Sequence, residues 1–143
     1  MTVRLARRGF PLRLGAAAAG ALALAACLLW RDPRAAGAYP PCPFNALTGG
    51  LLCPGCGSMR CLRALLGGGF AEALHDNALA CAAIPFLAAL TWDDLRVAAG
   101  GEGWRWPRRP VVGRIVLVAT VAFWVLRNLP VAPFTFLAPL PVG

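Results

Sequence analysis

The sequence contains no lysine, one histidine and only six acidic residues in a chain of 143. Charged residues make up 14% of it and apolar residues 59%, which is too apolar for an ordinary soluble core. No acid–base pair falls inside an apolar run, and this argues against a pump or a hydrolase acting alone. The composition therefore favours one integral membrane domain, residues 1–143.

Because lysine is absent, arginine carries all of the side-chain positive charge, and the formal net charge is +8. The arginines flank apolar runs and do not form the continuous basic patch, interleaved with aromatic residues, that is typical of nucleic-acid binding. Anionic lipid headgroups are the better counter-charge. We therefore expect the lipid bilayer as the main partner, with other membrane proteins or self-association as further partners, and no nucleic acid.

Three apolar runs predict transmembrane helices over residues 12–30, 78–92 and 111–129. The second run is the shortest and would reach only ~22 Å at 1.5 Å per residue. It contains Pro85, which predicts a kink. The fold class expected from these runs is all-α: an integral membrane protein with about three transmembrane helices and a cysteine-rich interfacial loop.

The remaining segments are polar or rich in proline and glycine. They predict a basic N-terminus (1–11), a cysteine loop with a short helix (31–69), an interfacial helix (70–77), a polar connection (93–110) and a proline-rich tail (130–143). Residues 35–57 are expected to lack regular structure, Ser58 to cap the short helix, and the glycines at 67–69 to end it. Arginines are most frequent in the N-terminus and the polar connection. The positive-inside rule therefore places the N-terminus in the cytoplasm and the cysteine loop outside the cell membrane.

Cys27 lies in the first apolar run and Cys81 in the second, so both are expected to be buried small side chains. The sequence from Leu24 to Cys27 also resembles a lipoprotein cleavage box, in which Cys27 would become the new N-terminus. The apolar run continues through residues 28–30, however, whereas a processed lipoprotein turns polar after its cysteine. A retained helix is the favoured interpretation, and cleavage at Cys27 is the alternative.

Three further thiols, those of Cys42, Cys53 and Cys56, lie in the predicted loop, and three interpretations compete. The first is a zinc site, because Cys-x-x-Cys followed by glycine has the form of a zinc knuckle, with Cys61 or His75 as the fourth ligand. The second is a structural disulfide between Cys42 and either Cys53 or Cys56, stabilising the loop by ~3 kcal/mol.

The third interpretation is thiol redox chemistry by Cys53 and Cys56, which precede a helix as in thioredoxin-type enzymes. The βαβ surroundings expected for that motif are absent from the sequence. Arg60 lies close to the thiols and is expected either to reach the membrane interface or to bind an anionic ligand.

Three more polar residues flank the predicted spans. Asn77 is expected to cap the second span. Arg127 and Asn128 close the third span and are expected to satisfy its terminal carbonyl groups or to reach the loop on the same membrane face.

The loop resembles a family of small bacterial membrane proteins known as domain of unknown function 2752. The resemblance covers about residues 40–92 and reaches the third span. It rests on Cys42, Pro43, Thr48, Gly49, Cys53, Pro54, Gly55, Cys56, Gly57, Arg60, the Leu65-Leu66-Gly67 sequence, Asn77, Arg127 and Asn128. The family pattern usually has threonine at Ser58 and proline at Ala78, and it does not include Cys61 or His75. The resemblance implies an architecture and supplies no reaction, substrate or cofactor.

These observations together predict a multi-pass membrane protein that is non-enzymatic, with a structural or zinc-binding cysteine loop, and accessory to a larger membrane complex. The alternatives are a membrane thiol-disulfide oxidoreductase that uses Cys53 and Cys56, and a small transporter or channel subunit, which would need a polar path through the helices.

Overall fold

The computed structural model describes residues 2–35, 37–98, 100–104 and 109–139, and for residues 2–13 the backbone alone. The side chains of the basic N-terminus, and Arg105 and Arg108 of the polar connection, therefore lie outside what is described. The described residues form helices, turns and coil, with no strand among them. This confirms the all-α prediction.

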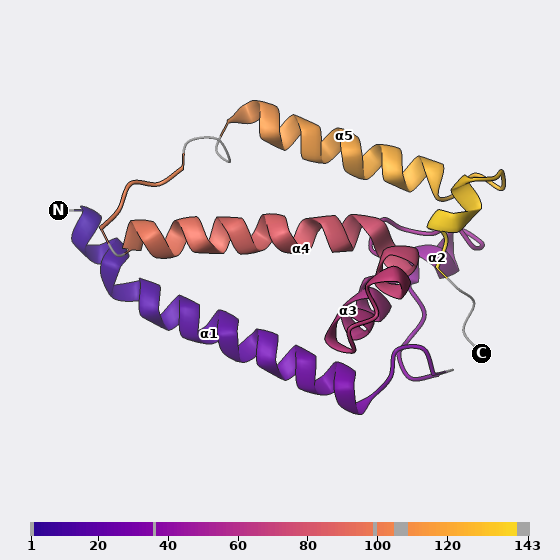
Figure 1. The fold of residues 1–143 in the computed structure, drawn as a ribbon, viewed down its shortest axis with the longest axis horizontal. Coiled ribbons are helices and arrows are strands. Elements are labelled where there is room, and N and C mark those ends of the chain that lie inside the picture. The colour runs from indigo at the N-terminus through magenta and orange to yellow at the C-terminus, as the bar shows by residue number, and fades with distance from the viewer. Residues whose placement is uncertain (1, 36, 99, 105–108, 140–143) are drawn as a thin grey trace.

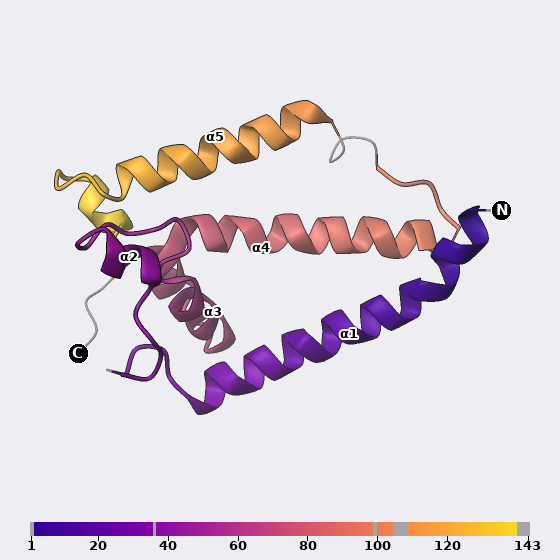
Figure 2. The same cartoon turned by 180° about the vertical axis from the view of Figure 1, so that it is seen from behind.

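Three long helices dominate the fold: α1 (Thr2–Trp30), α4 (Phe70–Ala98) and α5 (Pro110–Leu126). α4 lies between the other two in both views (Figures 1 and 2). Among the described residues only α4 is long and apolar enough to cross a membrane, by length and composition, while Leu14–Trp30 and Pro110–Leu126 are shorter apolar helices. The predicted spans 12–30 and 78–92 are therefore helical throughout, whereas the third, 111–129, is helical only as far as Leu126. Of the three helices, only α4 is long enough by itself to cross a membrane.

α4 consists of two helical segments that meet at Asn77, whose backbone is extended (φ −165°, ψ 94°). This break agrees with the predicted boundary between residues 70–77 and 78–92. The second segment remains helical through Pro85, the position of the predicted kink, and continues past the predicted end at residue 92 to Ala98. The polar residues of α4 after residue 92 can remain helical because Asp93 is buried and accepts a hydrogen bond from the Trp104 amide (2.7 Å).

The cysteine loop contains one helical turn, α2 (Pro43–Leu47), where no regular structure was expected. Pro43 allows this turn because proline fits the first position of a helix, whose N–H has no partner within the helix. A second short helix, α3 (Ser58–Leu66), occupies the predicted place. Its cap is Gly57, in the left-handed conformation (φ 85°), and the predicted capping bond from Ser58 is not made.

The glycines after α3 end it as predicted. The Gly67 amide donates to the Arg63 and Ala64 carbonyl groups, and Gly68 is left-handed (φ 81°). α3 then packs across the first part of α4 (Figure 1). Their contact buries a small core of short side chains: Cys61, Ala64, Ala73 and Cys81.

Cys81 is buried as expected, but Cys27 is exposed and its sulfur contacts the Tyr39 hydroxyl at 3.5 Å. The difference arises because α1 turns its Leu28 side chain inward and Cys27 lies on a neighbouring face of the helix. A 3₁₀ turn, η1 (Phe134–Leu137), covers α4 at the other end of the chain, where Phe136 packs edge-on against His75.

Candidate metal centre

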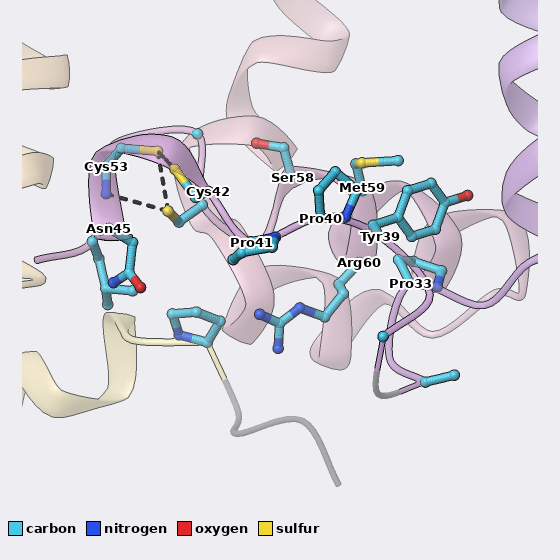
Figure 3. A pocket seen from close by; sticks show the side chains of 17 residues that line it. Pro33, Tyr39, Pro40, Pro41, Cys42, Asn45, Cys53, Ser58, Met59 and Arg60 are labelled. Atoms are coloured by element: carbon cyan, nitrogen blue, oxygen red, sulfur yellow. Dashed lines mark hydrogen bonds between the residues drawn. The ribbon is translucent and has the colours of Figure 1, made fainter. Parts of the chain in front are cut away.

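The sulfur atoms of Cys42, Cys53 and Cys56 lie within 4.8 Å of one another. Cys53 Sγ lies 3.1 Å from Cys56 Sγ and 3.6 Å from Cys42 Sγ. All three side chains are half-buried, at one end of a cavity of about 590 Å³ whose lining also includes Tyr39 (Figure 3). The structure therefore brings together the three loop cysteines that the sequence singled out.

Helix α2 and the turn after it return the chain from Cys42 to Cys53. Thr48 ends α2 by donating its hydroxyl to the Phe44 carbonyl (2.7 Å). Gly49 follows in the left-handed conformation (φ 70°), which lets the chain reverse. The motif residues Thr48 and Gly49 thus shape the loop and lie outside the group of thiols.

The Pro54-Gly55 pair forms a tight turn between the other two cysteines. The Cys56 amide donates to the Cys53 carbonyl (3.1 Å), and the Cys53 amide donates to Cys56 Sγ (3.3 Å). The next residue, Gly57, passes so close to α4 that a Cβ there would overlap the Asp76 carbonyl oxygen. The turn is therefore pressed against α4 directly after the second thiol.

Arg127, at the end of α5, holds the carbonyl side of this turn. Its guanidinium donates to the carbonyl oxygens of Cys53 (3.1 Å), Pro54 (3.3 Å) and Cys56 (3.1 Å). Arg127 is 2% exposed and also stacks on the Phe123 ring at 4.8 Å. A buried cation that binds three carbonyl oxygens fixes the backbone of the turn.

Asn77 holds the same turn from α4. Its amide group donates to the Pro54 carbonyl (2.9 Å), the Cys56 carbonyl (3.1 Å) and the Ser58 hydroxyl (3.1 Å). Its Oδ1 accepts from the Ala80 amide (3.0 Å), which is the predicted capping bond. One residue therefore both starts the second half of α4 and binds the loop.

Asn128 completes the contact from α5. It forms a pair of hydrogen bonds with the backbone of Leu52, accepting from its N–H (2.8 Å) and donating to its carbonyl (2.9 Å). It also donates to the Trp124 carbonyl (2.8 Å). Both expectations for the end of the third span are thus met, since this end satisfies a helix carbonyl and reaches the loop. We call Asn77, Arg127 and Asn128 the clamp.

The thiols differ in acidity. Backbone N–H groups, that of Asn45 foremost, lower the pKa of Cys42 below its usual value. Burial raises the pKa of Cys56 to about 12, and its hydrogen bond with Cys53 acts in the same direction. Without a metal, Cys42 is therefore the easier of the two to ionise.

The two residues considered as a fourth ligand lie outside the group of three. Cys61 faces Cys81 in the contact between α3 and α4, with the sulfurs 3.2 Å apart. His75 packs on Phe136, with ring centroids 4.4 Å apart. Arg60 lines the cavity, as the anionic-ligand expectation requires. The three thiols and Arg60 therefore line the same cavity.

An ion-pair cluster around the buried Asp76, which the sequence did not reveal, anchors the start of the loop. Arg34 binds Asp76 (2.8 Å) and Glu72 (2.7 Å) of α4, and these carboxylates raise its pKa. Asp76 is 1% exposed, so the pair ties the loop to the residue before Asn77. No short-range pattern signals this pair, because its members are far apart in the sequence.

Comparison with known proteins identifies one family. Neither the curated proteins nor the solved structures include a match to this chain. The profile of the family described as "Protein of unknown function (DUF2752)" matches residues 42–91, which include the three loop thiols and Asn77. Arg127 and Asn128 lie beyond the matched segment. Residues 42–91 thus match the DUF2752 family model, which confirms over this segment the resemblance inferred from the motif.

Proposed function

We propose that this chain is a multi-pass membrane protein in which Cys42, Cys53 and Cys56 bind a zinc ion. In this proposal the protein is non-enzymatic and serves as an accessory subunit of a larger membrane complex. The observation that carries the proposal is the convergence of three sulfur atoms within 4.8 Å. Three soft thiolate ligands suit zinc far better than magnesium or calcium.

The distances between the sulfurs support this ion. Zinc–sulfur bonds of ~2.3 Å in tetrahedral geometry place neighbouring sulfurs about 3.8 Å apart. The pair Cys42–Cys53 is at 3.6 Å and the pair Cys53–Cys56 at 3.1 Å, so the second pair would have to open by several tenths of an ångström. The fourth position would open onto the cavity, where a water molecule or an exogenous ligand can enter.

The charge of the surroundings also supports a zinc ion at the three thiols. Three thiolates and one divalent ion carry a net charge of −1, which is costly in a half-buried site unless a cation lies nearby. Arg127 supplies that cation from behind the loop backbone and is itself buried. The clamp therefore offsets the charge of the occupied site while holding its backbone in place.

The membrane part of the proposal rests on the surfaces of the long helices. α5 has no buried residue and exposes a series of valine, leucine and isoleucine side chains, and α1 exposes Leu22, Leu29 and Trp30. Such apolar surface suits lipid. The N-terminus and the α4–α5 connection lie at one end, and the cysteine loop lies at the other (Figure 1). We place the first end in the cytoplasm because arginine is more frequent there.

One observation favours a second candidate, a thiol oxidoreductase. The sulfurs of Cys53 and Cys56 are the closest pair in the loop, at 3.1 Å. The third thiol, that of Cys42, lies 3.6 Å from Cys53 Sγ, however; a two-thiol reaction has no role for it, whereas a zinc site uses it as a ligand. Zinc binding is therefore our preferred function.

The test is metal analysis of the full chain, purified in detergent without reductant or added metal. We expect about one zinc ion per chain, and chelation should release it and make the loop thiols reactive. Cys42→Ser should reduce the zinc content strongly, whereas Cys27→Ser, which changes a thiol on α1 outside the group of three, should leave it unchanged.

Absence of zinc together with a Cys53–Cys56 disulfide would instead favour the oxidoreductase. The midpoint potential of that pair would then distinguish a working dithiol from a stable structural bond. Absence of zinc together with free loop thiols would contradict the zinc site, and the oxidoreductase would then require that Cys53 and Cys56 form a disulfide on addition of an oxidant.

A further inference from the structure

The second pair of thiols in the structure lies outside the loop. Cys61 on α3 and Cys81 on α4 bring their sulfurs to 3.2 Å, about 1 Å more than a disulfide bond of ~2.05 Å. Both are buried, at 0% and 8% exposure, in the contact between the two helices. We propose that Cys61 and Cys81 form a disulfide bond that joins α3 to α4 beside the cysteine loop in the mature protein.

The small size of the surrounding core supports this bond. Apart from the two cysteines, the buried core between α3 and α4 consists of Ala64 and Ala73, with Leu65 and Ala80 packed beside them. Such short side chains bury little apolar area, and domains with small cores commonly depend on covalent crosslinks. A bond between Cys61 and Cys81 also closes a chain segment that includes the glycine turn and the break at Asn77.

The bond must form while α3 and α4 are still coming together, because packing brings the two thiols close and the finished contact makes them inaccessible. Burial raises the pKa of Cys61 to about 12, with the nearby Cys81 and Asp76 acting in the same direction. In the folded chain its thiolate is therefore scarce. The same burial protects the finished bond from external thiols.

The oxidant is a disulfide of an external thiol compound, encountered during folding on the oxidising side of the membrane. One cysteine thiolate attacks a sulfur of this disulfide and expels one external thiolate. The other cysteine thiolate then attacks the resulting mixed disulfide and expels the second. Two S–H bonds of the protein are replaced by one S–S bond, and the external disulfide is reduced to two thiols.

Arginine cleavage sites separate the cysteines well enough for a direct test. Cleavage after arginine gives one peptide with all three loop thiols (residues 35–60), a short peptide with Cys61 (61–63) and a longer one with Cys81 (64–96). Cells that express the full chain are quenched in acid. Free thiols are then blocked with N-ethylmaleimide in denaturant, and the peptides are analysed by mass spectrometry before and after reduction.

We expect peptides 61–63 and 64–96 to be joined, to carry no maleimide and to separate on reduction. Recovery of both peptides in the blocked, unlinked form would overturn the proposal, and so would a link from either of them to peptide 35–60. This experiment uses the unaltered chain, so a folding defect of a variant cannot affect its result. It is also independent of zinc content, so this proposal and the metal site can fail separately.

Two variants provide the matched comparison. Cys81→Ser should remove the linked species and make peptide 61–63 appear with maleimide. Cys27→Ser, which changes a cysteine outside this core, should leave the link intact. A link that persists in Cys81→Ser would contradict the pairing.

Discussion

At the scale of single residues, the three loop thiols share a site but differ in ionisation. Cys42 receives hydrogen bonds from backbone N–H groups, whereas Cys56 is partly removed from solvent. The first effect favours the thiolate and the second disfavours it. In the metal-free protein, Cys42 should therefore react with alkylating reagents before Cys56.

In zinc-stripped protein at pH 8, we expect iodoacetamide to modify Cys42 at least tenfold faster than Cys56, since the thiolate is the reactive form. The rate at Cys56 should keep rising with pH toward its pKa of about 12, whereas the rate at Cys42 should level off earlier. Timed mass spectrometry of peptide 35–60 measures both rates. Equal rates at the two positions would contradict the assigned environments.

Arg127 should raise the zinc affinity indirectly, by fixing the backbone that carries the thiols. Arg127→Met removes three hydrogen bonds to loop carbonyls and the nearest buried cation, and we expect zinc affinity to fall by roughly 10–100-fold. Arg127→Lys keeps the charge but loses the forked donors, so its effect should be intermediate. Competition with a zinc-binding dye measures the affinity. Arg114→Met, the same change at the exposed opposite end of α5, is the control and should have no effect.

At the scale of elements, the close contact between α3 and α4 depends on Gly57. Gly57→Ala puts a Cβ into the Asp76 carbonyl and a side chain at a left-handed position, so we expect it to lower the free energy of unfolding by about 2 kcal/mol or more. Gly55→Ala is the control, since its Cβ would meet only Cys53 Sγ, at 3.9 Å. Thermal unfolding in detergent compares the two, and equal losses would argue against the close approach.

Asn77 has two roles that substitutions can separate. Asn77→Ser keeps a side-chain oxygen to cap the second half of α4, whereas Asn77→Ala loses the cap as well, so the two should differ by ~1 kcal/mol in unfolding free energy. Both remove the amide that binds the Pro54 and Cys56 carbonyls. Both should therefore weaken zinc binding to a similar extent, measured by the same dye competition. A normal affinity in either variant would show that the clamp does not need Asn77.

The elements show what a sequence can and cannot predict here. The helices, the break before residue 78 and the glycine end of α3 follow from local patterns, and they were predicted. The loop turn α2 was missed because a count of prolines and glycines does not say where one helical turn fits. The pairing of Cys61 with Cys81, and of Arg34 with Asp76, depends on how α3 and the loop pack on α4, which short-range spacing does not encode.

At the scale of the whole molecule, the proposed orientation can be tested with membrane-impermeant maleimide on intact cells. Ala35→Cys, exposed at the end that carries the cysteine loop, should be labelled above the level of the parent chain. Glu102→Cys, exposed in the α4–α5 connection at the other end, should be labelled only after the cells are permeabilised. The reverse pattern would place the cysteine loop in the cytoplasm and contradict the orientation.

The candidate site is also discontinuous in the chain, and this has a consequence for biosynthesis. Its thiols lie between residues 42 and 56, but the guanidinium that fixes their backbone belongs to residue 127. A ribosome therefore delivers all three thiols well before it delivers the clamp. The nascent chain passes through a stage in which the sulfurs are present and their support is missing. If these thiols bind zinc as proposed, the site should reach its full affinity only once α5 has been inserted beside the loop, so zinc would bind more weakly before that stage.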